Sequence, residues 1–437
     1  MLIAAVKFGR HAQRPNQARL PTATRLGNVP DMTIGTSSIK VVDLFAGCGG
    51  LTQGFHEYRP DGWTASPFRT VGAVESDIAA ASTYAANFAQ EAGGTDHIHA
   101  GDIKDWDPAV LGTDVDVILG GPPCQGFSGL GKEDVNDPRN KLWREYKRVV
   151  NKLKPKVFII ENVDRFLKSG EFASLVDATA SDGDLSDYQL AEPRILNAAD
   201  YGVPQARKRA IVLATRRDLI KNSQLLTHPA PSHRKPVADE SAAMIEIDDR
   251  KPWETINSIF ARTPNDAPIK DLPDRRCSPL GTELPGTFHT YELHIGRNPT
   301  QMSLARYKAI PEGGNRKNLT GALTTENWRG HNTGSGDVMG RMHWNQPSVT
   351  IRTEFYKPEK GRYLHPDGNV HRPITHYEAA LIQGFPESFK WCGSKIAIGK
   401  QIGNAVPVGL SRALASQVYE FLVSANAVIV SPLQQSA

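Results

Sequence analysis

The sequence predicts an α/β protein: a doubly wound, Rossmann-like sheet followed by a second, smaller and irregular domain. From residue 39 to 215, short apolar runs alternate with amphipathic stretches, which is the pattern of parallel strands joined by covering helices. From about residue 217 to 346 this alternation gives way to a segment rich in Pro, Gly, Asn and charged residues. Because doubly wound sheets bind ligands at the carboxyl ends of their strands, functional residues are expected there.

Each apolar run in the first region has the length of a buried strand, and each amphipathic stretch has helical spacing. We predict strands at residues 40–45, 70–75, 97–102, 115–120, 156–161 and 210–215. Helices are predicted at 51–58, 78–88, 141–153 and 172–179, and regular pattern returns with helices at 375–383 and 408–424. No internal repeat interrupts this order.

Length and composition exclude several classes of protein. The 437 residues suffice for two or three folded units, and 39% hydrophobic with 22% charged residues is typical of a soluble globular chain. The most apolar stretch, at residues 418–430, is interrupted by polar side chains, so no membrane span is predicted. The four cysteines form no CxxC pair, which argues against a disulfide framework and a zinc cluster, so no metal is expected. A reducing, cytoplasmic compartment fits best.

The net charge of +4 is too small to identify a partner, but the charge is unevenly distributed. Acidic residues gather at 164–192, and basic residues gather at 205–235 and at 297–341, where aromatic residues are interleaved. This mixture is expected where phosphates and bases are bound, although a solvated surface explains a single basic run equally well. Residues 1–37 are expected to be a flexible basic arm; a transit peptide, or a translation start at Met32 instead of Met1, would explain its composition as well.

A glycine-rich turn follows the first predicted strand, in the run DLFAGCGG that begins at Asp43. Glycines after a strand let a ligand approach the backbone at a helix N-terminus, although a purely structural turn is an open alternative. The candidate cofactor contacts in this turn are Asp43, Phe45, Ala46, Gly47 and Gly49. Thr52 stands where a nicotinamide-binding turn has its third glycine, so that cofactor is disfavoured.

The next two strands end in residues that suit an adenosine. Glu75 can accept bonds from both ribose hydroxyls, and Asp102-Ile103 can hold an adenine edge. Three successive strand ends therefore indicate an adenosine-like ligand.

The later strands end in residues that suit catalysis. The fourth runs into GGPPCQGFS, whose prolines hold Cys124 on a rigid loop where a nucleophile would be placed; a buried, inert thiol is the alternative. The fifth ends at Glu161, next along the same edge, although a solvated strand end would look the same. The sixth begins after QARKR, in which Gln205, Arg207 and Arg209 share a face.

Taken together, these segments resemble the C5-cytosine DNA methyltransferases of bacterial restriction-modification type, over about residues 41–414. The resemblance rests on DLFAGCGG (43–50), Glu75, GDI (101–103), GGPPCQGFS (120–128), ENV (161–163), QARKR (205–209), RPITHYEAALIQGFP (372–386) and IGNAVPV (402–408). Tyr377 and Leu381 stand at positions where that family often carries Arg. The resemblance implies an S-adenosylmethionine-dependent methyltransferase sheet. It also implies that this cofactor contacts Phe45, Glu75, Asp102, Ile103, Pro123, Asn404 and Val406.

The resemblance further implies a mechanism, in which the Cys124 thiolate adds to C6 of a flipped-out cytosine. Glu161 then acts at N3 and Arg207 steadies the base, while Gln205 and Arg209 complete the catalytic set. The glycine-rich stretch 126–131 and the residues after it resemble the family's mobile loop. Ser128 and Arg139 of this loop are expected to face DNA.

The implied organisation is discontinuous. A catalytic domain at 38–216 is followed by a small target-recognition domain at 217–390, a return to the catalytic domain at 391–428 and a tail at 429–437. Loop arginines of the recognition domain are expected to contact DNA, namely Arg297, Arg306, Arg316, Arg329 and Arg341.

The expected partner is double-stranded DNA, and the expected role is protection of bacterial host DNA in a restriction-modification system beside a separately encoded endonuclease. The protein is expected to be a monomer associated with DNA in the bacterial cytoplasm. Two alternatives remain: an RNA cytosine-5 methyltransferase of the same fold, and a catalytically silent DNA-binding homologue.

Overall fold

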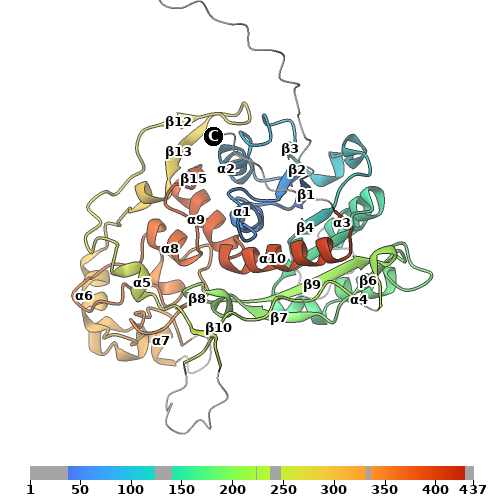
Figure 1. Cartoon of the computed structure of the whole chain (residues 1–437). Coiled ribbons are helices and arrows are strands. Elements are labelled where there is room, and N and C mark those ends of the chain that lie inside the picture. The colour runs from blue at the N-terminus through green and yellow to red at the C-terminus, as the bar shows by residue number, and fades with distance from the viewer. Residues whose placement is uncertain (1–37, 124–139, 223, 237–247, 331–335, 429–437) are drawn as a thin grey trace, which may run out of the picture. The chain divides into compact units, whose positions relative to one another are not determined.

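An eight-stranded sheet is the centre of the computed structural model (Figure 1). The structure describes residues 38–123, 140–222, 224–236, 248–330 and 336–428, which lie within one compact unit, Thr36–Ala437. The strand order is β3-β2-β1-β4-β5-β9-β6, and β7 also pairs with β9. The strands are β1 (Ile39–Leu44), β2 (Phe68–Glu75), β3 (Ile98–Ala100), β4 (Val117–Gly120), β5 (Val157–Asn162), β6 (Tyr188–Leu190), β7 (Arg194–Asn197) and β9 (Lys208–Arg216).

Helices cover both faces of this sheet because its strands are apolar on both sides. In β1, Val41 packs with α1 and α10, whereas Val42 packs on the opposite face with α3 and α4. Figure 1 shows α10 lying across the same face as α1. The pair packs closely, since the Ser411 hydroxyl donates to the Leu51 carbonyl. The helices are α1 (Gly50–Glu57), α3 (Asn140–Leu153), α4 (Gly170–Ala178) and α10 (Val408–Ser424).

A second core joins the β2–β3 edge of the sheet to the C-terminal half of the chain. Tyr84 and Phe88 of α2 pack in one cluster with Ile382, Trp391 and Ile402. The elements in this core are α2 (Ile78–Phe88), α8 (His376–Ile382), β15 (Lys390–Cys392) and α9 (Lys395–Asn404). The end of α9 is thereby held beside the first strands of the sheet.

Short elements and long connections make up residues 217–390, as the sequence predicts for an irregular region. These elements are β10 (His233–Arg234), β11 (Lys251–Pro252), α5 (Asn257–Phe260), β12 (Arg276–Cys277), β13 (Leu284–His289), α6 (Gln301–Ala309), α7 (Glu326–Gly330) and β14 (Ser348–Val349). β14 pairs with β8 (Gln205–Ala206), so this region is tied directly to QARKR. A small core around Tyr307, Ile310 and Leu364 lies apart from the two larger ones.

The predicted α/β fold is confirmed, with one correction to the sheet. β1 to β5 are parallel, but the sixth predicted strand, β9, is antiparallel to β5. The chain reaches β9 through β6 and β7, which both pair with it antiparallel, so no helical crossover enforces a parallel register. These two strands, of three and four residues, are too short to show a period and were not predicted.

Helix α9 was also not predicted, because Gly399 and Gly403 weaken its helical pattern. The structure shows why glycine stands there. A Cβ at Gly399 would lie 2.8 Å from the Tyr356 ring, and one at Gly403 would lie 2.4 Å from the backbone of Arg352. The glycines allow α9 to pack closely against residues 350–356.

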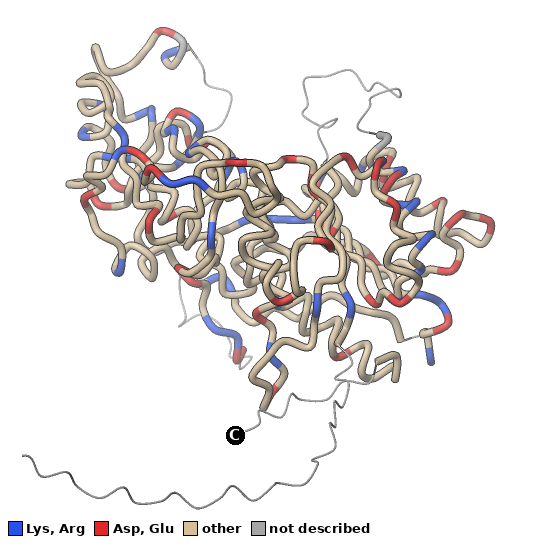
Figure 2. The backbone as a smooth tube through the Cα atoms, turned by 90° about the horizontal axis from the view of Figure 1, so that it is seen from above, with Lys and Arg blue, Asp and Glu red and all other residues tan. Residues whose placement is uncertain are grey.

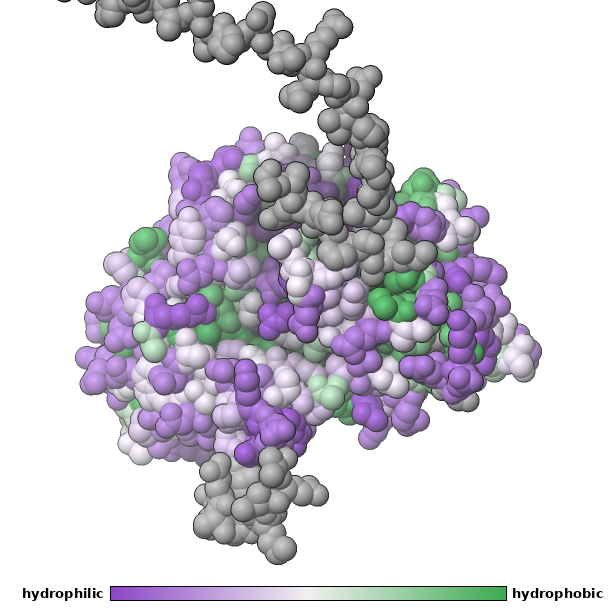
Figure 3. Space-filling model, in the orientation of Figure 1, coloured by the Kyte–Doolittle hydropathy of each residue, from purple (hydrophilic) through white to green (hydrophobic). Residues whose placement is uncertain are grey.

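The visible face of the molecule is mainly hydrophilic, with small separated apolar areas (Figure 3). Figure 2 shows both basic and acidic residues in each half of the molecule. Among the described residues, no helix is long and apolar enough to cross a membrane.

Candidate active site

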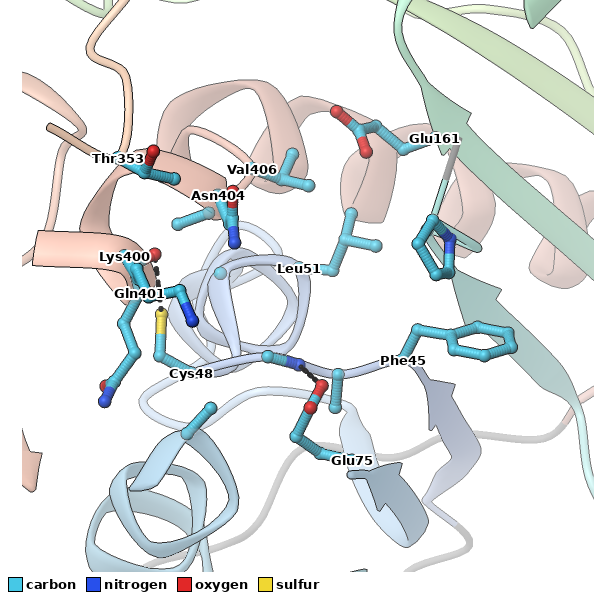
Figure 4. Close-up of a pocket in the computed structure, with 18 of the residues that line it drawn as sticks. Phe45, Cys48, Leu51, Glu75, Glu161, Thr353, Lys400, Gln401, Asn404 and Val406 are labelled. Atoms are coloured by element: carbon cyan, nitrogen blue, oxygen red, sulfur yellow. Dashed lines mark hydrogen bonds between the residues drawn. The ribbon is translucent and has the colours of Figure 1, made fainter. Parts of the chain in front are cut away.

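A cavity of about 620 Å³ opens at the carboxyl ends of β1, β2, β4 and β5 (Figure 4). After β1 the chain builds outward to β2 and β3, and then returns to the other side of β1 with β4, so the cavity lies where the strand order reverses. It brings together eleven predicted site residues: Asp43, Phe45, Ala46, Gly47, Glu75, Pro123, Glu161, Arg207, Arg209, Asn404 and Val406.

The turn after β1 is shaped by left-handed backbone conformations. Phe45, Gly47 and Gly49 have φ values of 57°, 56° and 91°. A Cβ at Gly49 would lie 2.3 Å from the Phe88 ring, so this glycine is needed for packing against α2. Gly49 itself is not among the residues that line the cavity, although Cys48 and Gly50 on either side of it are. The backbone N–H of Gly47 faces Glu75 instead of remaining free.

Glu75 is held at the end of β2 by two backbone bonds. Its Oε2 accepts from the Gly47 N–H at 2.9 Å, and its Oε1 accepts from the Asp77 N–H at 2.7 Å. Burial raises the pKa of Glu75 above its ordinary value. Each carboxylate oxygen keeps a second lone pair for a ligand hydroxyl.

Asp43 lies fully buried at the end of β1. Its Oδ2 accepts from the Thr52 hydroxyl at 2.6 Å, and that hydroxyl also contacts the Tyr84 hydroxyl at 2.9 Å. Thr52, which replaces the third glycine of a nicotinamide-binding turn, therefore anchors this carboxylate. Burial raises the pKa of Asp43 to about 7. Its Oδ1 is buried and has no hydrogen-bond partner in the described part of the chain.

Glu161 and two arginines form a second wall. Arg209 Nε lies 2.7 Å from Glu161 Oε1, which places an ion pair at the end of β5. Arg207 is buried and donates to the Ile351 carbonyl at 2.9 Å and to the Gly403 carbonyl at 3.0 Å. Burial and then the nearby Arg209 lower the pKa of Arg207 to about 9, so its guanidinium stays charged at neutral pH. Figure 4 shows Glu161 and Glu75 on different walls of the cavity.

Gln205 acts as a cross-link, because both ends of its amide form hydrogen bonds inside the protein. Its Nε2 donates to Gln383 Oε1 at 2.7 Å, and its Oε1 accepts from the Ile351 N–H at 2.8 Å. Gln205 is buried and is absent from the cavity lining, so the structure does not bring it together with the other predicted catalytic residues. It supports the strand that carries Arg207.

Asp102 and Ile103 are also absent from the cavity lining. Asp102 caps a short 3₁₀ turn by accepting from the Lys104 N–H, and Ile103 is buried in the core beneath α3. Local capping and core packing thus use the side chains that were predicted to hold an adenine. Three further predictions, Cys124, Ser128 and Arg139, lie outside the described residues.

Comparison with known proteins identifies the family. The family described as C-5 cytosine-specific DNA methylase matches residues 39–420. The chain belongs to this family. The predicted resemblance is thereby confirmed, and the chain is a methyltransferase that acts on C5 of cytosine in DNA.

Several relatives match this methyltransferase over most of its length. The type II methyltransferase M.DdeI of Desulfomicrobium norvegicum is 30% identical over 407 residues, covering 89% of this chain and 91% of the relative. M.Eco47II of Escherichia coli is also 30% identical, covering 91% and 83%. Among solved structures, a prophage-encoded protein of E. coli has a TM-score of 0.59 at 23% identity, covering 88% of this chain and 100% of that one. Dnmt2 of S. pombe has a TM-score of 0.52 at 17% identity, covering 88% and 99%. At these identities the two structures show the fold alone.

The predicted DNA-contacting arginines of this methyltransferase have different surroundings. Arg297 and Arg329 are exposed, and each donates one bond to a backbone carbonyl. Arg306 is partly buried, donates to the Leu323 carbonyl and stacks on the Trp328 ring. Arg316 is partly buried.

Arg341 corrects the prediction. Its side chain is fully buried, and five carbonyls accept from it at 2.6 to 3.0 Å: Tyr307, Ile310, His365, Asp367 and Val370. A guanidinium enclosed in this way holds the fold and does not reach DNA.

The sequence reasoning missed several lining residues, among them Leu51, Asn162, Arg352, Lys400 and Gln401. Lys400 had a usable signal, since it precedes Asn404 by four residues and so shares its face of a helix. Arg352 had no usable sequence signal, because it follows a two-residue strand in the irregular region. Both side chains are exposed at the cavity, and neither has a hydrogen-bond or ion-pair partner among the residues that the structure describes.

Proposed function

We propose that the cavity binds S-adenosylmethionine together with a cytosine flipped out of duplex DNA, and that Cys124 adds to C6 of that cytosine. One observation carries this proposal: two sets of residues line the same cavity. The first set is the glycine turn and Glu75, and the second is Arg207 and the Glu161–Arg209 ion pair. The first set suits an adenosine, and the second suits a polar base.

The cavity fits the cofactor in size and chemistry. Its volume of about 620 Å³ lies in the range of sites for ligands of this size. Asp43 Oδ1 and Gln401 Oε1 are buried without a partner in the described structure, and buried polar atoms are normally paired. S-adenosylmethionine supplies a methyl group on a positively charged sulfonium, an ammonium and a carboxylate. Asp43 would attract the positive groups, and Lys400 would pair with the carboxylate.

The opposite wall suits the cytosine. Arg207 keeps its charge, and its Nε has no partner among the described residues, so it can donate to the base carbonyl. Gly121 leaves room for Glu161, since a Cβ there would lie 3.3 Å from Oε2. Glu161 would act at N3 while the thiolate adds to C6, which makes C5 nucleophilic enough to accept the methyl group. Loss of the C5 proton and of Cys124 then restores the aromatic ring.

Cys124 is assigned by its place in GGPPCQGFS. The chain just before it is held at the site, because Asn162 Nδ2 donates to the Pro122 carbonyl at 2.9 Å. The residue after Glu161 therefore anchors the segment that leads to the nucleophile. A stacked base cannot expose C6 to a thiol, so flipping is part of the proposal.

Duplex DNA containing 5-fluorocytosine tests the mechanism, because the fluorine cannot leave as the C5 proton does. The wild-type protein and a Cys277→Ser control should form a denaturation-resistant adduct, and Cys124→Ser should form none. Cys124→Ser should also lose methyl transfer while it keeps cofactor and DNA affinity. Turnover by Cys124→Ser, or an adduct mapped to Cys48, would exclude Cys124.

We further propose that the methyl group protects host DNA beside a separately encoded restriction endonuclease, as the type II names of the relatives suggest. The protein would act as a monomer in the bacterial cytoplasm, where chromosomal DNA lies. Bisulfite sequencing of host DNA should reveal one methylated motif. Labelled methyl transfer to tRNA in place of duplex DNA would favour the RNA alternative, and absence of cofactor binding would favour a silent homologue.

A further inference from the structure

Two of the four cysteines meet in space, away from the cavity. Cys277 of β12 and Cys392 of β15 are 115 positions apart in the chain, yet their Sγ atoms lie 3.5 Å apart as free thiols. We propose that this pair is a modification site, at which a low-molecular-weight disulfide such as oxidised glutathione converts the two thiols into a reversible intramolecular disulfide.

The contact depends on a missing side chain in the strand between them. β13 lies between β12 and β15, with Leu284 opposite Cys277 and Gly286 opposite Cys392. A Cβ at Gly286 would lie 3.0 Å from Cys277 Sγ and 3.3 Å from Cys392 Cα. Glycine therefore opens a gap through which the two thiols approach across a whole strand.

The sulfurs must approach by about 1.5 Å to reach the bonding distance of about 2.0 Å. Cys392 is held in place, because its N–H donates to Thr83 Oγ1 at 2.8 Å and its carbonyl accepts from Gln401 Nε2 at 2.9 Å. Cys277 is only half buried and belongs to a two-residue strand. The Cys277 side should move, so the disulfide should leave Gln401 and the cofactor cavity in place.

The reaction balances as two thiol–disulfide exchanges. The Cys277 thiolate attacks one sulfur of oxidised glutathione, which forms a mixed disulfide and releases one glutathione thiolate. Cys392 then gives up its proton and attacks the Cys277 sulfur, which releases a second glutathione. Burial raises the pKa of the Cys392 thiol, so the second exchange should be the slower step and should accelerate as pH rises.

Cys48 provides a control within the same molecule. Its thiol is buried and contacts the Gln401 carbonyl at 3.7 Å, and burial raises its pKa as well. It should stay reduced under conditions that link Cys277 to Cys392.

The test uses the full chain, incubated with oxidised glutathione at pH 8, alkylated and digested without reductant. Mass spectrometry should find the peptide with Cys277 joined to the peptide with Cys392, and Cys48 alkylated. Cys124 is followed on its own peptide, since a catalytic thiol can react with the same reagent. The unfolding temperature should rise by roughly 5 °C, because the bond closes a long loop, and dithiothreitol should reverse the rise.

Cys277→Ser should abolish both the linked peptide and the temperature shift. The affinity for S-adenosylhomocysteine, measured by calorimetry, should differ less than twofold between the oxidised and reduced wild-type protein. Glutathione that remains on Cys277 without a linked peptide would overturn the proposal, as would an equal temperature shift in Cys277→Ser. A larger loss of affinity would overturn the inference that the Cys277 side moves.

Discussion

Two buried arginines show how differently the sheet region and residues 217–390 use the same side chain. Arg207 lines the cavity, gives two of its donors to carbonyls and keeps Nε without a partner in the described structure. Arg341 is bonded to five backbone carbonyls and lines no part of this cavity. One guanidinium is available for chemistry, and the other acts as a scaffold.

The difference follows from how each region satisfies its backbone. In the sheet, strand ladders pair the carbonyls, so side chains at strand ends are left for a ligand. Residues 217–390 have few ladders, and their buried carbonyls need other donors. Arg362 has the same role as Arg341, since its Nη1 donates to the carbonyls of Gly313, Gly314 and Arg341 itself. Arginine therefore replaces secondary structure as the source of donors in this region.

Arg341→Leu should destabilise the protein, because it removes the arginine that acts as a scaffold. It would remove one donor from each of five carbonyls, and although the Tyr307 and Asp367 carbonyls also accept from the backbone N–H groups of Ile310 and Val370, the free energy of unfolding should fall by about 3 kcal/mol or more. Arg329→Ala is the matched control, because that arginine is exposed and donates one hydrogen bond. The free energy of unfolding of this variant should stay within about 0.5 kcal/mol of the wild-type value. Denaturant unfolding measures both. Equal stability of the two variants would refute the scaffold role.

Exchange of each buried arginine for Lys should separate the effect on catalysis from the effect on stability. Arg207→Lys keeps a charge but cannot bridge Ile351 and Gly403, so kcat/KM for methylation should fall about 100-fold, with about 1 kcal/mol lost in stability. Arg341→Lys should show the reverse, with a larger stability loss and kcat/KM per folded molecule within about threefold of wild type. Equal activity losses would mean that Arg341 also serves the site.

Asp43 should make the stability of the sheet region depend on pH. Its pKa is about 7 in the folded protein and about 3.9 when unfolded, so the folded state binds more protons between these values. The free energy of unfolding should therefore fall as pH rises from about 4 to 7, by up to roughly 1.4 kcal/mol per pH unit from this residue. Asp43→Asn should flatten that part of the profile. Identical slopes for both proteins would contradict the raised pKa.

A bound cation would favour the ionised form of Asp43. Cofactor affinity should therefore increase as pH rises from 6 towards 7 and level off above it, with protons released on binding below that point. Calorimetry in two buffers of different ionisation enthalpy measures this release. Asp43→Asn should remove it, and release that persists in the variant would assign the proton to another group.

Lys400 and Arg352 should give the smallest effects, because both are exposed. Lys400→Ala should weaken cofactor binding about three- to fivefold and leave DNA affinity unchanged. Arg352→Ala should weaken DNA binding and leave cofactor affinity unchanged. If Arg352 contacts a phosphate, the variant should also reduce the salt slope of DNA binding by about one. Titrations of both ligands at two salt concentrations separate the roles. A cofactor defect in Arg352→Ala would place both residues at one ligand.

The cavity was largely predictable because parallel βα units are local. Asp43, Glu75 and Glu161 each stand at the end of a buried strand, and the ends of parallel strands meet at one edge. The predicted cofactor residues that the structure leaves outside the cavity lining have local structural uses. Asp102 caps a turn and Gly49 makes room for Phe88, and these uses have the same sequence signature as ligand binding.

Resemblance to the family's ordered motifs identified the family from the sequence alone, and hydrophobic period with strand-end residues predicted the parallel part of the sheet and three acidic residues of the cavity, Asp43, Glu75 and Glu161. Only the tertiary structure decided which arginines are enclosed, that Lys400 and Arg352 reach the cavity, and that Cys277 meets Cys392 across Gly286. The physical reason is distance along the chain. Periodicity and turn chemistry depend on residues that are a few positions apart. By contrast, the contact between an arginine and a distant carbonyl, and the contact between two thiols 115 positions apart, form only when the chain packs.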